Sequence, residues 1–135
     1  MIAVDSNIII YIHVQSTWTG KALQVLKKDP QWISPPLWES EFRNVLAEFM
    51  RRRILELEQA QLIMNSALKT MEGREILPPS NLVLELAASS DCSAYDCEYA
   101  ALAKHFHINL ITNDQKILHN FPETAVSMDA FLFSP

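Results

Sequence analysis

Four acidic side chains of this sequence lie at the ends of expected strands or in the first turns of expected helices, where they could take part in chemistry. Asp5 follows the buried stretch "IAV" and Asp114 follows the apolar stretch "INLIT". An ionised carboxylate beside a buried element must be paired or must hold a cation. Glu41 and Asp96 lie in the first turns of two expected helices, where the helix dipole favours anions.

Carboxylates that gather within a few ångströms repel one another and need a counter-charge. Mg²⁺ takes oxygen ligands and commonly reaches protein through a few carboxylates plus a substrate phosphate. A set of acids without His or Cys indicates Mg²⁺ or Mn²⁺ rather than zinc. The chemistry that suits such a set is hydrolysis of a phosphodiester.

The elements that must position these acids alternate along the chain between short apolar stretches and longer amphipathic ones. This alternation predicts an α/β fold, an α/β/α sandwich with a four- or five-stranded, mostly parallel sheet. Strands are expected at 2–4, 32–34, 108–112 and 125–128, with a further candidate at 75–77; helices are expected at 8–14, 18–28, 37–52, 56–71, 80–89 (capped by Ser80), 94–106 and 114–119. In open parallel sheets the working crevice lies beyond the carboxyl ends of the strands, where Asp5 and Asp114 are expected.

Each acid also has an ordinary structural explanation. Asp5 and Asp114 are suited to cap the helices that follow them. Asp96 suits the first turn of its helix as a complement to the dipole, and Glu41 suits a solvated helix face. The agreement of all four on one expected rim of the sheet favours the metal site.

The bulk composition sets limits on the class of protein. A chain of 135 residues suits one domain, here 1–135, with one core. No apolar stretch is long enough to span a bilayer and no signal peptide is recognisable, so we expect a cytoplasmic protein with no membrane partner. With only Gly20 and Gly73, no glycine-rich phosphate loop can form. Cys92 and Cys97 lack zinc spacing and are interpreted as small packing residues.

Four segments in order resemble the signatures of a known family. They are "VDSN" at 4–7, "ESEFRNVL" at 39–46, "SAYDCEYAALA" at 93–103 and "ITNDQKIL" at 111–118. Together they resemble the PIN domain, and most of all its VapC-type ribonuclease toxins from bacterial and archaeal toxin–antitoxin pairs. The resemblance covers nearly the whole chain.

The resemblance implies roles for particular residues. The four acids would be the catalytic, metal-binding set. Asn7, Asn44 and Thr112 match the family's small polar positions and would orient ligands or waters. Asn44 lies one helical turn after Glu41, on the same face. For Asn7, a plain turn-forming role is the alternative.

Two residues near Asp96 have less certain roles. Glu98 follows Asp96 by two positions, so an ideal helix turns it about 200° away. This spacing favours a solvated side chain, but Glu98 is retained as a fifth candidate metal ligand because some relatives carry an acid there. Tyr95 is expected to pack or to cap the helix.

The implied activity is that of a Mg²⁺- or Mn²⁺-dependent endoribonuclease. The resemblance also implies a homodimer and a small antitoxin protein, for which the apolar faces of 37–52 and 56–71 are the candidate interfaces. Two alternatives stay open: a PIN-like scaffold that binds nucleic acid or protein without cutting, and a flap-type DNA nuclease.

The charge balance needs separate comment because the net charge of −5 is unusual for a nucleic-acid binder. Without the four acids the net charge is −1, so the rest of the chain is close to neutral and is not expected to repel RNA. Lys116 is the best candidate for a substrate-phosphate contact. Arg51–Arg53 are interpreted as complementing the dipole at the end of a long helix, with a role in gripping RNA as the alternative. Trp18, Trp32 and Trp38 are expected to pack rather than to stack on bases.

Overall fold

A four-stranded parallel sheet forms the centre of the computed structural model, which describes all of residues 1–135. Its strands are β1 (Ile2–Val4), β2 (Trp32–Ile33), β3 (Leu110–Ile111) and β4 (Ala125–Val126). The order across the sheet is β2-β1-β3-β4, and each neighbouring pair is parallel. β1 and β3 are therefore central neighbours, and the residues that follow them share one edge of the sheet.

Eight helices connect and cover the strands. They are α1 (Ser6–His13), α2 (Thr19–Lys28), α3 (Leu37–Arg51), α4 (Leu57–Thr70), α5 (Ser80–Ala88), α6 (Ala94–Phe106), α7 (Gln115–Asn120) and α8 (Met128–Phe133). No helix combines the length and the apolar character that a bilayer crossing requires.

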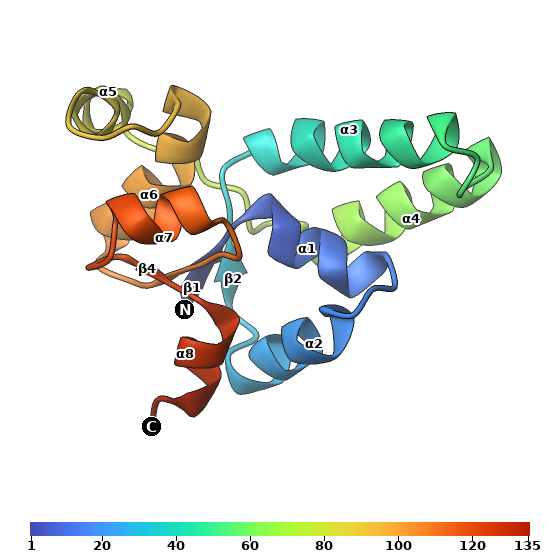
Figure 1. Cartoon of the computed structure of the whole chain (residues 1–135), viewed down its shortest axis with the longest axis horizontal. Coiled ribbons are helices and arrows are strands. Elements are labelled where there is room, and N and C mark those ends of the chain that lie inside the picture. Colours follow the sequence, from blue (N-terminus) through green and yellow to red (C-terminus); the bar gives the residue numbers. More distant parts are fainter.

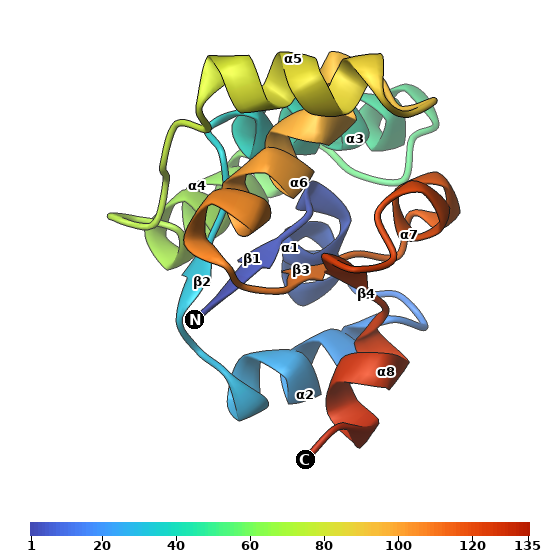
Figure 2. The same cartoon turned by 90° about the vertical axis from the view of Figure 1, so that its left-hand side faces the viewer.

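The helices form layers on the two sides of the sheet. In Figures 1 and 2, α5 and α6 lie above the strands and α2 and α8 lie below them. The antiparallel pair α3 and α4 extends to one side, at the right of Figure 1. The arrangement confirms the predicted α/β/α architecture and its parallel sheet.

The apolar runs of the sequence make one continuous core of 30 buried residues. Ile2, Ala3 and Val4 are all buried because both faces of β1 are covered. The middle of α6 is buried as well, and four of its residues between positions 97 and 103 are alanines or cysteine, whose small size lets the helix lie close to the strands.

The structure corrects several expected boundaries. The segment 75–77 is not a strand: it makes one isolated bridge between Ser34 and Glu75, and Pro78 and Pro79 then remove the donors that a longer ladder needs. The strand expected at 108–112 is two residues long, because the Ile108 N–H bonds the Ala103 carbonyl at the end of α6.

One helix start, one helix cap and one whole helix also differ from the expectations. Helix α1 begins at Ser6, two residues early, because Asp5 caps it. The N-cap of α5 is Pro79, so Ser80 is the first helical residue and does not cap. Helix α8 was not expected; Ser127 caps it by accepting a hydrogen bond from the Ala130 N–H. Cys92 and Cys97 are buried free thiols, as predicted.

Candidate metal centre

The edge of the sheet positions Asp5 and Thr112 side by side. The Asp5 N–H bonds the Ile111 carbonyl, and the Thr112 N–H bonds the Val126 carbonyl, so both residues continue the parallel ladder just past the named strands. The Thr112 hydroxyl donates to Asp5 Oδ2 at 2.7 Å. The first and last motifs of the sequence therefore meet at one rim.

Asp5 is 6% exposed and is the one acidic or basic residue of the chain that is buried. Oδ1 accepts the Ser6 N–H at 2.7 Å. Burial raises the pKa of Asp5 to about 7, and the nearby carboxylates of Glu41 and Asp114 add to the rise, while the bonds from Thr112 and Ser6 oppose it. Without a cation, a large fraction of Asp5 is protonated at neutral pH.

Asp114 shares this rim and also caps α7. Its Oδ1 accepts from the N–H groups of Lys116 and Ile117 at 2.9 and 3.1 Å. The Asp114 N–H in turn bonds the Thr112 hydroxyl at 3.0 Å. The capping explanations for Asp5 and Asp114 are thus correct, and in each carboxylate the cap uses only Oδ1.

Next to this rim lies a cleft of about 550 Å³ between α1, α3 and α6. Its polar lining includes Glu41, Asp96, Asn7 and Asn44. Asp96 is positioned by the N-cap of α6, where Ser93 Oγ accepts the Asp96 N–H at 3.1 Å. Burial raises the pKa of Asp96, and the Asp114 carboxylate adds to the rise.

Glu41 is positioned by Tyr99, whose role the sequence did not predict. The buried Tyr99 hydroxyl donates a short hydrogen bond to Glu41 Oε1. Burial, and then the charge of Glu41, raises the pKa of Tyr99 well above its usual range, so this hydroxyl stays a donor. Tyr99 follows Asp96 by three positions on α6, and this spacing places both on one helix face.

Asn7 has an unsatisfied acceptor at the cleft. Its Nδ2 lies 3.4 Å from Asp5 Oδ2, whereas its buried Oδ1 has no hydrogen-bond partner. An orphaned buried oxygen is costly, and a water donor or a cation at this position would satisfy it. Asn44 lines the cleft one turn beyond Glu41, as expected from its spacing.

The donor chemistry of this rim suits a hard divalent cation, since every candidate donor is an oxygen. No group of three or more His, Cys, Asp or Glu side chains is arranged in the structure to hold a metal ion. The acids are instead in pairwise electrostatic contact, Asp5 with Glu41 and Asp114, and Asp96 with Asp114. Their ligand role stays a prediction.

Glu98 does not line the cleft that contains Glu41 and Asp96. It lines a separate hollow under α5, with Leu77 and Leu84. Burial raises the pKa of Glu98, and the charge of Glu41 adds to the rise, so the two carboxylates do influence each other.

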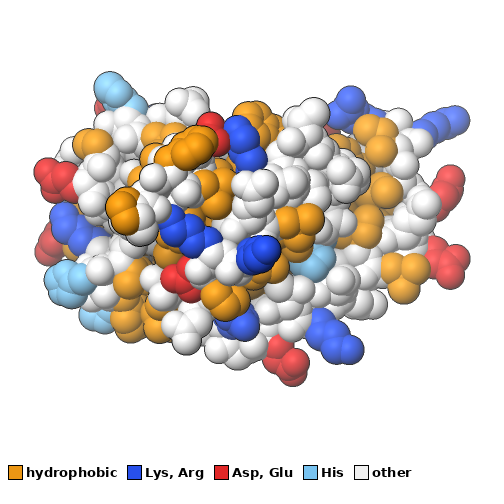
Figure 3. Space-filling view, turned by 90° about the horizontal axis from the view of Figure 1, so that it is seen from below, with side chains coloured by type: hydrophobic (Ala, Val, Ile, Leu, Met, Phe, Trp, Pro, Cys, Tyr) orange, Lys and Arg blue, Asp and Glu red, His pale blue; other side chains and the backbone are white.

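No Lys or Arg side chain is among the residues that line the cleft. Burial raises the pKa of Asp96, and Lys116 lies close enough for its positive charge to oppose part of that rise. Arg51 pairs with Glu48 at the far end of α3, ten residues or about 15 Å beyond Glu41. In the view of Figure 3, Lys and Arg side chains are scattered among acidic and apolar ones.

The aromatic residues divide into two groups. Trp32 and Trp38 are buried in the core, as predicted, whereas Trp18 is 39% exposed and stacks on Tyr11. Tyr95 was expected to pack or cap and does neither. It is 65% exposed and lines the cleft beside Asp96, because α6 turns it away from the sheet.

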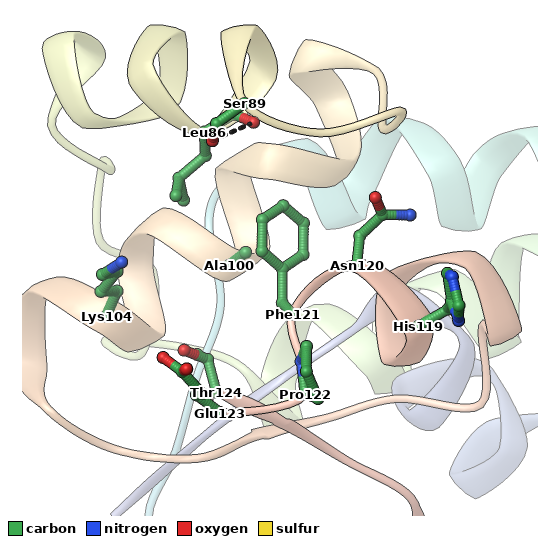
Figure 4. Close-up of a pocket in the computed structure, with 10 residues that line it drawn as sticks. All are labelled: Leu86, Ser89, Ala100, Lys104, His119, Asn120, Phe121, Pro122, Glu123 and Thr124. Atoms are coloured by element: carbon green, nitrogen blue, oxygen red, sulfur yellow. Dashed lines mark hydrogen bonds between the residues drawn. The ribbon is translucent and has the colours of Figure 1, made fainter.

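A second hollow, of about 430 Å³, lies between α5, α6 and the loop after α7 (Figure 4). The side chains of Lys104, His119, Asn120 and Phe121 surround it, and Glu123 is its one acid. None of the four acids lines it, so the cleft at the sheet edge is the better candidate for the active site.

The comparisons with known proteins agree with this geometry. The family model of the PIN domain matches residues 2–123. The chain belongs to the PIN domain family. PIN domains are generally metal-dependent nucleases. None of the curated protein sequences compared with this PIN domain matches it significantly.

Solved structures share the fold of this PIN domain over nearly its whole length. PAE2754 from Pyrobaculum aerophilum has a TM-score of 0.74 at 19% identity, covering 97% of this chain and 85% of that chain. FitAcB from Neisseria gonorrhoeae has a TM-score of 0.74 at 16% identity, covering 95% and 98%. A structure of FitAB bound to the IR36 DNA fragment has a TM-score of 0.71 at 15% identity, covering 95% of each chain.

Proposed function

We propose that this PIN domain is a Mg²⁺- or Mn²⁺-dependent endoribonuclease, the toxin of a type II toxin–antitoxin pair, acting in the cytoplasm. The observation that carries the proposal is the buried carboxylate of Asp5, 6% exposed, with two further acids near it and no basic side chain bonded to it. A protein core tolerates such a group best when a cation completes it.

Asp5, Glu41, Asp96 and Asp114 are the residues that would hold the cation. A bound divalent cation neutralises charge on the scissile phosphate and lowers the pKa of water at the site. The remaining residues position the acids: Thr112 orients Asp5, Tyr99 orients Glu41, and the Ser93 cap orients Asp96.

Two further residues complete the site. The free Oδ1 of Asn7 is available to orient a water. Lys116 contributes positive charge next to Asp96, where a substrate phosphate would approach. Glu98 is left outside the proposed ligand set because it lines another hollow.

The α3 and α4 pair is the proposed surface for protein partners. A mostly apolar groove between these helices is lined by Leu46, Met50, Leu57 and Met64. Exposed Leu57 and Leu62 add apolar surface, which a monomer would leave in water. A homodimer and a small antitoxin are the proposed occupants, in keeping with the toxin proposal.

The proposal is tested by incubating the full chain with labelled single-stranded RNA, an RNA hairpin and single-stranded DNA, each with Mg²⁺, Mn²⁺ or EDTA. The DNA arm is included because FitAB was solved with a DNA fragment. We expect cleavage of RNA with metal and none with EDTA. Asp5→Asn and Asp96→Asn should each reduce the rate by orders of magnitude.

The matched control is Glu85→Gln, which removes one negative charge from an exposed position on α5 outside the cleft. It should cut at the wild-type rate. Cleavage that persists in both cleft variants would contradict the metal-site assignment. Cleavage confined to DNA would favour the DNA-nuclease alternative, and RNA binding without cleavage would favour the scaffold.

A further inference from the structure

Tyr95 is an aromatic side chain that the structure leaves uncovered at the mouth of the acid-lined cleft. It is 65% exposed and is one of the residues that line this cleft. It is also the residue before Asp96, and consecutive Cα atoms are about 3.8 Å apart. The ring therefore begins within a few ångströms of an acid at the proposed reaction centre.

The backbone that carries Tyr95 is fixed rather than loose. Tyr95 is the second residue of α6, a helix of 13 residues whose N-cap is closed by the Ser93 side chain. Packing does not account for the ring, since the buried side of α6 is formed by Cys97, Tyr99 and the residues that follow. A rigid base under an open ring is what a stacking surface requires.

The rest of the cleft is divided between polar and apolar walls. Glu41 and Asp96 lie among its polar lining, whereas Ile10, Leu37 and Val45 give an apolar wall contributed by α1 and α3. A cleft that needed only to hold a cation and a phosphate would have no use for that wall. A nucleotide has both parts, a charged phosphate and an apolar base face.

We propose that Tyr95, together with the apolar wall of Ile10, Leu37 and Val45, forms a nucleobase-binding surface that takes one base of single-stranded RNA next to the scissile phosphate. This inference rests on the ribonuclease function proposed above. It gives the site a reason to prefer unpaired RNA, because a base in a duplex has no free face to offer.

The test measures binding of a short labelled oligoadenylate and of an abasic oligomer with the same ribose-phosphate backbone. All proteins carry Asp5→Asn so that the RNA stays intact, and Mn²⁺ is present throughout. Tyr95→Ala should weaken oligoadenylate binding about fivefold to a hundredfold, the usual loss for one stacked base. Tyr95→Phe, which keeps the ring, should stay within about twofold of the parent.

The abasic oligomer separates stacking from a structural effect. It should bind equally to the parent and to Tyr95→Ala, because the missing contact needs a base. Phe133→Ala is the matched control, since Phe133 is an exposed aromatic on α8 that lines no part of the cleft. Tyr95→Gln provides a second ringless variant, and circular dichroism checks that each protein is folded.

Unchanged oligoadenylate binding in both ringless variants would overturn the base surface. So would a loss of abasic-oligomer binding in Tyr95→Ala as large as the loss of oligoadenylate binding. A loss of oligoadenylate binding in Tyr95→Phe as large as in Tyr95→Ala would overturn it too. These results are independent of the cleavage assay with Tyr95 intact. If wild type cuts RNA but the ringless variants bind normally, the base surface is wrong and the ribonuclease function stands. If wild type does not cut RNA but the ring is needed for binding, the ribonuclease function is wrong and the base surface stands.

Discussion

At the scale of single residues, Asp5 decides how the cleft responds to pH. Its carboxyl is buried beside Glu41 and Asp114, and its pKa is raised to about 7 from 3.8. The folded protein therefore holds a proton that the unfolded chain releases, over the range from about pH 4 to pH 7. Protonation stabilises the fold there, and the stabilisation is lost as the pH rises through 7.

The metal-free protein should accordingly be more stable at pH 5 than at pH 8, by about 2–3 kcal/mol for Asp5 alone. The measurement is urea unfolding at a series of pH values after removal of metal. Asp5→Asn has no titrating group at this position and should flatten the profile. A profile as steep in Asp5→Asn as in wild type would show that Asp5 is not the group responsible.

Thr112 offers a second test at this scale, because its buried hydroxyl serves two acids. It donates to Asp5 Oδ2 at 2.7 Å and accepts from the Asp114 N–H at 3.0 Å. Thr112→Val keeps the shape, leaves both groups without this partner, and should lower the free energy of unfolding by about 1–3 kcal/mol. Thr112→Ser keeps the hydroxyl and should lose less; equal losses in chemical denaturation would refute the hydrogen-bond explanation.

The sequence predicted the rim residues better than their neighbours. Asp5 and Asp114 could be placed because each follows a strand, and strand ends of a parallel sheet share an edge. Tyr99 was missed because a tyrosine in an alanine-rich helix is normally core, and its bond to Glu41 depends on how α3 and α6 cross. Tyr95 was misjudged because sequence spacing does not reveal what covers the first turn of a helix.

At the scale of elements, helix caps do much of the positioning. Asp5, Ser93, Asp114 and Ser127 each cap a helix through the side chain. Ser93 and Ser127 make similar bonds, each accepting an N–H at 3.1 Å three residues on. Of these two serine caps, only the Ser93 cap bonds a residue that lines the cleft, Asp96.

This pair gives a matched experiment. Ser93→Ala and Ser127→Ala should each lower the free energy of unfolding by about 1 kcal/mol. Only Ser93→Ala should also weaken Mn²⁺ binding, which isothermal titration calorimetry measures, because it loosens the turn that carries Asp96. An equal effect of the two changes on Mn²⁺ affinity would contradict the positioning role of the α6 cap.

The order and type of most elements followed from the sequence, whereas their ends and the last helix, α8, did not. Apolar periodicity is strong over α3 and α4, so their existence was predictable. Helix α8 is six residues long, and its formation depends on docking against α2, a contact that no local pattern encodes. The segment 75–77 has strand-like residues, but the two prolines that follow end the pairing.

At the scale of the whole molecule, the strand order brings residues from both ends of the chain to one edge of the sheet. Asp5 and Asp114 are 109 positions apart, and they meet because β1 and β3 are neighbours. A cation bound at this junction, as proposed, would couple the two ends of the chain and would therefore stabilise the complete fold rather than one element.

Adding Mn²⁺ at about one hundred times its dissociation constant should stabilise the protein by about 2.7 kcal/mol, seen as a rise in Tm. The rise should be larger at pH 8 than at pH 6, because Asp5 must lose its proton before it can bind a cation. Asp5→Asn should reduce the shift strongly and Glu85→Gln should leave it unchanged. A shift that is the same in all three proteins would indicate binding elsewhere.

The central claim, that the four acids at the sheet edge gather a divalent cation, is tested most directly by the anomalous diffraction of a crystal grown with Mn²⁺. The account predicts an anomalous peak in the cleft among Asp5, Glu41, Asp96 and Asp114, and no such peak in a crystal of Asp5→Asn. A Mn²⁺ peak confined to another part of the molecule, at a concentration that supports RNA cleavage, would contradict it.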